Sequence, residues 1–150
     1  HVPLQHIRAG QPRFTVIDSV LSEEAVLGFE YGYATTSPDS LVIYRSVIAE
    51  GHRYPALAQA FYHGGHGRFV AALAARRQAW HDAGLLHSDD AQADANRFLH
   101  MLRANLLEPG LLGLAPAFGP RQIQREVDAA RAAAVRLGTT LKLKPFVVMR

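Results

Sequence analysis

The chain has 150 residues, of which 49% are hydrophobic and 19% charged, a composition that excludes a disordered protein and predicts a globular one. It contains no cysteine, which excludes disulfides and thiolate chemistry and fits a cytoplasmic protein, and no apolar run reaches the roughly 18 residues of a membrane span. The formal net charge is +3, but arginines and acids are interspersed, which favours solvated helix faces over a nucleic-acid-binding surface.

Residues 1–43 are predicted to form a short βα segment. The β-branched run FTVIDSV, residues 14–20, predicts a strand. Ser22 then predicts the N-cap of a helix, with Glu23 and Glu24 in the first turn, where carboxylates complement the helix dipole.

Residues 44–138 predict a helical domain, because apolar side chains recur at helical spacing between Pro and Gly boundaries. A helix beginning at Pro55 should end at Gly64–Gly65. Three longer helices are predicted at about residues 67–83, 90–107 and 121–137. Ser88 is the predicted N-cap of the second of these, and Pro109-Gly110 the predicted break after it.

Residues 139–150 alternate Leu and Lys and then become wholly apolar, a pattern typical of a strand. The predicted fold class is therefore mainly α: a helical bundle with a short N-terminal βα segment and a C-terminal strand. The three predicted parts of the chain are residues 1–43, 44–138 and 139–150.

No sequence motif nominates a catalytic residue or a metal site. His63 and His66 are close in sequence, but no third ligand accompanies them and structural zinc takes four. A nucleophile elbow, a dinucleotide-binding glycine motif and a Walker sequence are all absent. We therefore predict no catalytic residue, no metal and no cofactor from the residues themselves.

Large apolar side chains in the helical region have two interpretations. They form a plain core, or some of them line an apolar ligand cavity of the kind that helical bundles build. Periodicity does not separate the two. The candidate ligand-binding residues are Phe61, Phe69, Leu73, Trp80, Phe98 and Met101.

The last predicted helix is rich in alanine, a residue that favours helix formation and lets helices approach closely. Small side chains on more than one face would allow packing both within the subunit and against a partner. Weak selection on an exposed surface is the alternative explanation for the many alanines of this helix.

Four segments in order, VIAEGHRYPALAQAFYHGG, HDAGLLHSDDAQADANRFLHMLRANL, LLGLAP and IQREVDAA, resemble the C-terminal regulatory domain of AefR-like TetR-family regulators. The resemblance implies an all-α domain that binds a small, often hydrophobic effector and forms a homodimer through its last two long helices. The family's helix-turn-helix has no counterpart here, so DNA binding by this chain alone is not expected. The residues implied at the dimer interface are Leu102, Leu106, Ile123, Val127, Ala130 and Ala134.

Residues 1–43, and above all LSEEAVLGFEYGYA, resemble a different family, the thiamine-diphosphate-dependent subunit of 2-oxoglutarate dehydrogenase. That resemblance implies that Glu23 is the glutamate that hydrogen-bonds the aminopyrimidine of the cofactor. The tail KPFVVM is similar to a strand of the same enzyme. The diphosphate site and its Mg²⁺ ligands have no counterpart in the sequence, so catalysis by this chain alone is not expected.

Three interpretations follow. The first is the effector-binding and dimerisation domain of a TetR-like regulator with a foreign N-terminal segment, by fusion, rearrangement, frameshift or engineering. The alternative is an inactive fragment or chimera of the dehydrogenase subunit, with Glu23, thiamine diphosphate and Mg²⁺ as its site. The third is a helical bundle without a selected activity.

Overall fold

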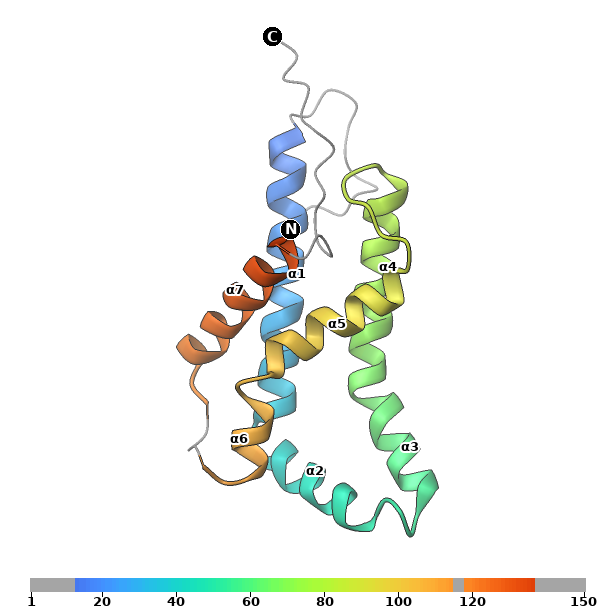
Figure 1. Ribbon diagram of the computed structural model, residues 1–150, viewed down its shortest axis with the longest axis vertical. Coiled ribbons are helices and arrows are strands. Elements are labelled where there is room, and N and C mark those ends of the chain that lie inside the picture. The colour runs from blue at the N-terminus through green and yellow to red at the C-terminus, as the bar shows by residue number, and fades with distance from the viewer. Residues whose placement is uncertain (1–12, 115–117, 137–150) are drawn as a thin grey trace.

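The computed structural model describes residues 13–114 and 118–136, and within these ranges the chain forms helices and no strand. The helices, labelled in Figure 1, are α1 (Arg13–Thr36), α2 (Pro38–Glu50), α3 (Pro55–Gly64), α4 (His66–Asp82), α5 (Ala91–Arg103), α6 (Leu107–Leu111) and α7 (Pro120–Arg136). The helical prediction for residues 44–138 is confirmed over the described part of that range.

Helix α1 runs through the centre of the molecule, and the other long helices pack around it (Figure 1). It contacts α4 on one side and α7 on the other, and α5 crosses between these two and touches all three. Helices α2 and α3 follow the end of α1 and lead back to α4. Helices α2 and α3 therefore extend away from the main bundle and lie below it in Figure 1.

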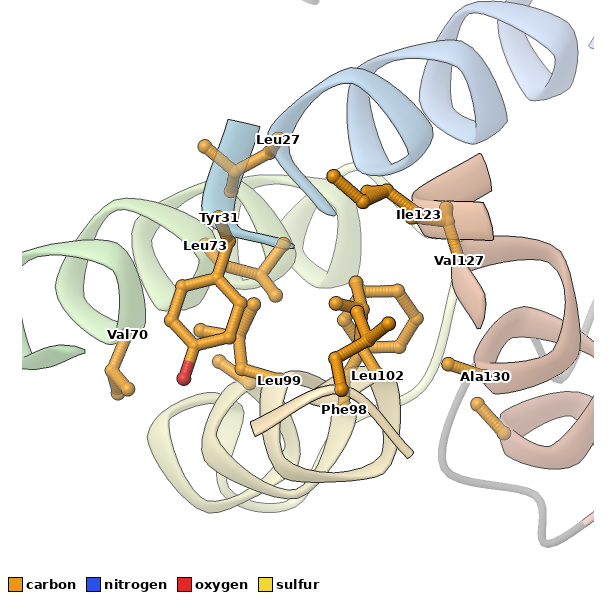
Figure 2. Packing of buried hydrophobic residues seen from close by; sticks show 13 residues of the cluster. Leu27, Tyr31, Val70, Leu73, Phe98, Leu99, Leu102, Ile123, Val127 and Ala130 are labelled. Atoms are coloured by element: carbon orange, nitrogen blue, oxygen red, sulfur yellow. The ribbon is translucent and has the colours of Figure 1, made fainter. Parts of the chain in front are cut away.

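The core lies where α1, α4, α5 and α7 meet, and Figure 2 shows their apolar side chains converging there. On α5 the apolar residues Ala95, Phe98, Leu99 and Leu102 recur at helical spacing and are all buried. Each large side chain removed from water in this way contributes about 1.5–3 kcal/mol. This one cluster accounts for how the four long helices hold together.

Two glycines on α1 allow this helix to lie close against its neighbours. Gly28 and Gly32 stand one turn apart, and a Cβ placed at either would come within 3.0 Å of a side-chain carbon on α5 or α7. At Gly32 the nearest atom is Cγ2 of Ile123, at 2.8 Å. Larger residues would push α1 away from the bundle.

The predicted N-terminal strand is wrong. Residues 14–20 lie inside α1, and Ser22 is within the helix and not at its start. Leu27 and Tyr31, four residues apart, are both buried on one helical stripe, so the helix serves the core better than a strand would. A helix also satisfies its own backbone groups, whereas a lone strand would leave unpaired edges. The predicted C-terminal strand at residues 139–150 lies outside the described residues.

The helix boundaries after residue 50 agree with the prediction at α3 and α4 and differ at α5. The N-cap of α5 is Asp90, whose Oδ1 accepts from the backbone N–H of Ala93 at 2.9 Å, and not Ser88. The Ser88 hydroxyl instead donates to Asp94 at 2.6 Å. Pro109 lies in the first turn of the short α6, where its missing N–H costs nothing.

Candidate functional site

A cavity of about 370 Å³ lies between the end of α1 and helices α2, α3 and α4. Pockets for small molecules in proteins are typically about 300–1,000 Å³. Its lining is mostly apolar, and the edge-on rings of Tyr44 and Phe61, with centroids 5.0 Å apart, join α2 to α3 at one wall. The other lining residues are Ala34, Thr35, Ser40, Ile43, Val47, Ala58, Tyr62, Gly65, His66, Phe69 and Arg103.

Two of the six predicted ligand-binding residues, Phe61 and Phe69, line this cavity. Three others belong to the bundle core: Leu73 and Phe98 are fully buried there, and Met101 is half-buried against it. Trp80 is buried in a separate small cluster. The structure therefore brings together only part of the predicted set.

The residues that sequence reasoning missed come mainly from α2. Ile43 and Val47 line the cavity beside Tyr44, yet in the sequence they straddle the predicted boundary at residue 43. Arg103 was missed because it ends α5, far along the chain from the other lining residues. No local pattern in the sequence indicates that a helix-terminal arginine reaches this space.

A chain of polar side chains borders the cavity, from α5 through α1 to α4. The Nη1 group of Arg103 donates to the Tyr31 hydroxyl at 3.1 Å, and that hydroxyl lies 2.7 Å from Nδ1 of His66. His66 Nε2 lies 2.7 Å from Oδ1 of Asn96. Since an amide oxygen only accepts, Nε2 carries the proton, and Nδ1 accepts from Tyr31. This assignment keeps the imidazole of His66 neutral.

Burial agrees with this arrangement of protons. It raises the pKa of Tyr31 to about 12, so the phenol stays protonated at neutral pH. Burial also lowers the pKa of His66, which favours the neutral ring. Of Tyr31, His66 and Arg103, only Arg103 therefore carries a charge.

In the described chain, the guanidinium of Arg103 is hydrogen-bonded to the Tyr31 hydroxyl and to a ring nitrogen of His100, neither of which is an anion. Its Nη2 donates to Nε2 of His100 at 2.8 Å, and His100 Nδ1 donates to the carbonyl oxygen of Asn96 at 2.8 Å. Across the described residues, no carboxylate forms an ion pair with Arg103. Within the described ranges, Arg103 is therefore a cation without a paired carboxylate that lines a largely apolar cavity.

A second, more polar hollow of about 660 Å³ lies on the far side of His66, between α4 and the start of α5. Both His63 and His66 line it, and Tyr62 and His66 separate it from the first cavity. In the part of the chain that the structure describes, no three His, Asp or Glu side chains are grouped as metal ligands.

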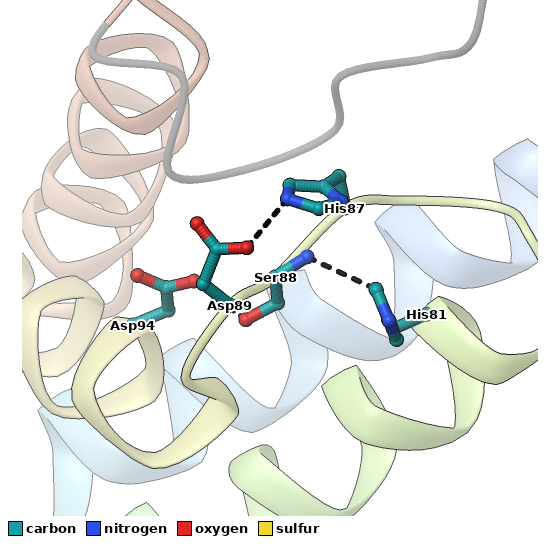
Figure 3. Close-up of polar contacts among 5 residues, drawn as sticks. All are labelled: His81, His87, Ser88, Asp89 and Asp94. Atoms are coloured by element: carbon teal, nitrogen blue, oxygen red, sulfur yellow. Dashed lines mark hydrogen bonds and ion pairs between the residues drawn. The ribbon is translucent and has the colours of Figure 1, made fainter.

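His81, in the last turn of α4, and His87, in the loop between α4 and α5, have structural partners (Figure 3). His87 contacts Asp89 at 2.8 Å, and the backbone N–H of Ser88 donates to Nδ1 of His81 at 3.1 Å. These contacts order the loop that leads into α5.

Glu23 and Glu24 are buried where α1 meets α4. The Glu24 carboxylate lies 3.7 Å from Arg77, and both side chains are fully buried, while Glu23 lies 3.9 Å from the partly exposed Arg76. Burial raises the pKa of Glu24, and the nearby charges of Arg77 and Arg131 oppose that rise. These carboxylates join two helices within the chain.

The six residues predicted at the dimer interface lie in the chain's own core: Leu102, Leu106, Ile123, Val127, Ala130 and Ala134. Their side chains are at most 3% exposed within the single chain. Helix α7 carries alanines on its exposed side as well, at Ala129 and Ala132. Small residues therefore occur on two faces of this helix, as its composition predicts.

None of the described helices is both long and apolar enough to cross a membrane.

Part of the chain is similar to curated enzymes. It is 61% identical over 46 residues to the 2-oxoglutarate dehydrogenase E1 component of Azotobacter vinelandii, and 63% identical over 50 residues to that of Cupriavidus necator. These matches cover 31% and 33% of this chain but only 5% of each enzyme. The chain thus spans about a twentieth of the length of these relatives, and the likeness is local.

The fold and most of the sequence match a different class of protein. A solved structure of a TetR-family transcriptional regulator from Mesorhizobium loti MAFF303099 superposes with a TM-score of 0.64 at 18% identity, over 82% of this chain and 69% of that one. The family model described as "AefR-like transcriptional repressor, C-terminal domain" matches residues 25–137, from within α1 to the end of α7. The chain belongs to the TetR family of transcriptional regulators, with residues 25–137 forming its AefR-like C-terminal domain.

Proposed function

We propose that this chain is the effector-binding and dimerisation domain of a TetR-like regulator, and that its effector is a small apolar molecule. The observation that carries the proposal is the cavity of about 370 Å³ with walls from Ile43, Tyr44, Val47, Phe61 and Phe69. Covering those side chains with an apolar ligand would remove their surface from water, at about 25 cal/mol for each Å². The proposal assigns no DNA contact to this chain and places it in the cytoplasm.

Binding of a neutral apolar dye such as Nile red tests the cavity. Phe61→Glu should abolish saturable dye fluorescence, because it places a charge in the apolar wall. Leu57→Glu is the matched control, since Leu57 lies one turn earlier on α3 and is exposed. Equal dye binding by both variants, with unchanged helical circular dichroism, would show that the cavity is not the site.

The proposed homodimer uses the exposed face of α7, because the inward face is taken up by the core. Ala129 and Ala132 are exposed there, while Ala130 and Ala134 pack inside the chain. Small side chains let a second helix approach closely, and the TetR-family match supports association through this end of the domain. In such a dimer, effector binding would change how the two copies are spaced.

The alternative function, an inactive fragment or chimera of a thiamine-diphosphate-dependent dehydrogenase subunit, rests on the local match to 2-oxoglutarate dehydrogenase. Under it Glu23 would contact the cofactor, yet this carboxylate lies 3.9 Å from Arg76 at the junction of α1 and α4. Calorimetric titration with thiamine diphosphate and Mg²⁺ decides the point. Saturable heat that disappears in Glu23→Ala would favour the enzyme fragment over the regulator domain.

A further inference from the structure

Arg103 is an unusual residue to find beside an apolar cavity. It lines the space together with Phe61, Phe69 and the apolar residues of α2, and it comes from a helix that contributes no other lining residue. Arg103 is only partly buried, so water still solvates part of its guanidinium, and a ligand that displaced this water would have to provide polar partners in its place. The neighbours that it does have in the described chain, Tyr31 and His100, are neutral hydrogen-bond acceptors.

The contacts of Arg103 fix its position without neutralising it. Tyr31 is itself tied to His66, and His66 to Asn96, so the hydroxyl that accepts from Arg103 is held from α4 and α5. His100 is held in turn by the carbonyl oxygen of Asn96. A guanidinium has five N–H donors, and these two contacts use only part of them.

From this geometry we propose that the effector carries an anionic head, of which a carboxylate is the simplest example, on an apolar body. The head would accept hydrogen bonds from Arg103, and the body would lie against Ile43, Val47, Phe61 and Phe69. A guanidinium and a carboxylate match in shape and charge, and such charge-assisted bonds are about twice as strong as neutral ones. The inference rests on the proposed function, because it names the chemical class of ligand for the same cavity.

His66 contributes to this selectivity as a positioning residue. It is neutral and bonded to Tyr31 on one side and Asn96 on the other, so it adds no second charge to the cavity wall. The cavity therefore presents one cation, Arg103, among side chains that are apolar or neutral and polar. That pattern selects against a cationic head as well as for an anionic one.

Competition against bound Nile red at neutral pH tests the inference with three probes of equal chain length: decanoate, decanol and decylamine. We expect decanoate to bind about tenfold to one-hundredfold more tightly than decanol, from the worth of a hydrogen bond to a charged group. Decylamine should bind more weakly than decanol. Arg103→Gln should reduce the ratio of decanoate to decanol affinity to near one.

Arg97→Gln is the matched control, because it removes a charge from the same helix at an exposed side chain bound to Asp94, and it should leave the ratio unchanged. Equal affinity for decanoate and decanol in the unmodified chain would overturn the anionic-head inference while the apolar site stands. A preference for decanoate that survives Arg103→Gln would overturn the role of Arg103. If neither the dye nor any probe binds, the proposed function itself fails.

Discussion

Gly32 offers a sharp test of how closely α1 packs against α5 and α7. A Cβ at this position would lie 2.8 Å from Cγ2 of Ile123 and 3.3 Å from Cδ2 of Leu102. Carbon atoms in contact normally stand about 3.5–4.0 Å apart, so one of the helices must shift by more than half an ångström. Both neighbours are fully buried, and Ile123 is branched at Cβ, so neither side chain can swing away freely.

The expected change in the free energy of unfolding follows from two opposing effects. Overpacking a core costs about 1–3 kcal/mol, and alanine recovers up to about 1 kcal/mol in helix propensity over glycine. Gly32→Ala should therefore destabilise the chain by about 0–2 kcal/mol. Gly32→Val adds two more methyl groups at the same contact and should cost about 3 kcal/mol.

Urea unfolding followed by circular dichroism measures these changes against Gly64→Ala, the matched control. A Cβ at Gly64, in α3, would meet no atom within 4 Å, so this variant should gain up to about 1 kcal/mol. The two alanine variants should thus differ by about 1–3 kcal/mol. If Gly32→Ala raises the unfolding midpoint as much as Gly64→Ala does, the close approach of α1 to α7 is refuted.

Three further predictions concern the buried charge pair, the histidine network and the dimer. Arg77→Met should lower the free energy of unfolding by about 3–5 kcal/mol, because the buried Glu24 carboxylate loses its ion-pair partner and keeps only the charge of Arg131 nearby. This loss should be smaller at about pH 5 than at about pH 8, where Glu24 is more fully ionised. The pKa of His66 is lowered from 6.5 in the folded state, so the unfolded state binds more protons as the pH falls, and the folded chain loses stability between about pH 7.5 and about pH 5.5. His66→Gln removes this titrating group and should make that loss of stability smaller. Ala129→Glu should shift sedimentation at micromolar concentration from dimer to monomer.

Each of these has a control and an outcome that contradicts it. Arg76→Met removes the neighbouring, partly exposed cation and should cost less than about 1 kcal/mol, so equal losses would argue against a special role for the buried pair. His63→Gln removes an exposed imidazole from the preceding turn, and the same pH profile in both histidine variants would show that His66 is not the titrating group. Ala75→Glu adds a charge to the exposed side of α4, and a dimer that tolerates Ala129→Glu equally well does not use the outer face of α7.

The sequence predicted the long helices of the C-terminal part well, because their pattern is local. On α7, Ile123, Val127, Ala130 and Ala134 recur at helical spacing and are all buried. The same regularity did not separate core from cavity or core from interface. Leu73 and Phe98 share the chemistry of Phe61, and only the way in which α2 and α3 fold back decides which of them faces an open space.

The segment SEEAVLGFEYGYA was predicted to begin a helix at Ser22, but that helix begins earlier, at Arg13. The β-branched run of residues 14–20 favours a strand, so the sequence places the start of the helix too late, and Gly28 and Gly32 lower its intrinsic helix propensity. In the three-dimensional structure the same glycines serve a different purpose: their lack of a side chain makes room for Leu102 and Ile123. The helix gives up intrinsic propensity and gains close contact with α5 and α7, which only the packed chain reveals.

The regulator-domain match begins within α1, and packing shows that the residues just before it belong to the same bundle. The regulator-domain match begins at residue 25, so it includes Leu27 and Tyr31, which face the core and the polar network, as well as both glycines. Glu23 and Glu24 precede that match and are held by Arg76 and Arg77 of α4. Because these carboxylates are joined to cations of the helical bundle itself, the part of α1 that carries Glu23 and Glu24 is integrated into the same fold. Whatever the origin of its sequence, this part of the helix contributes to the stability of the domain.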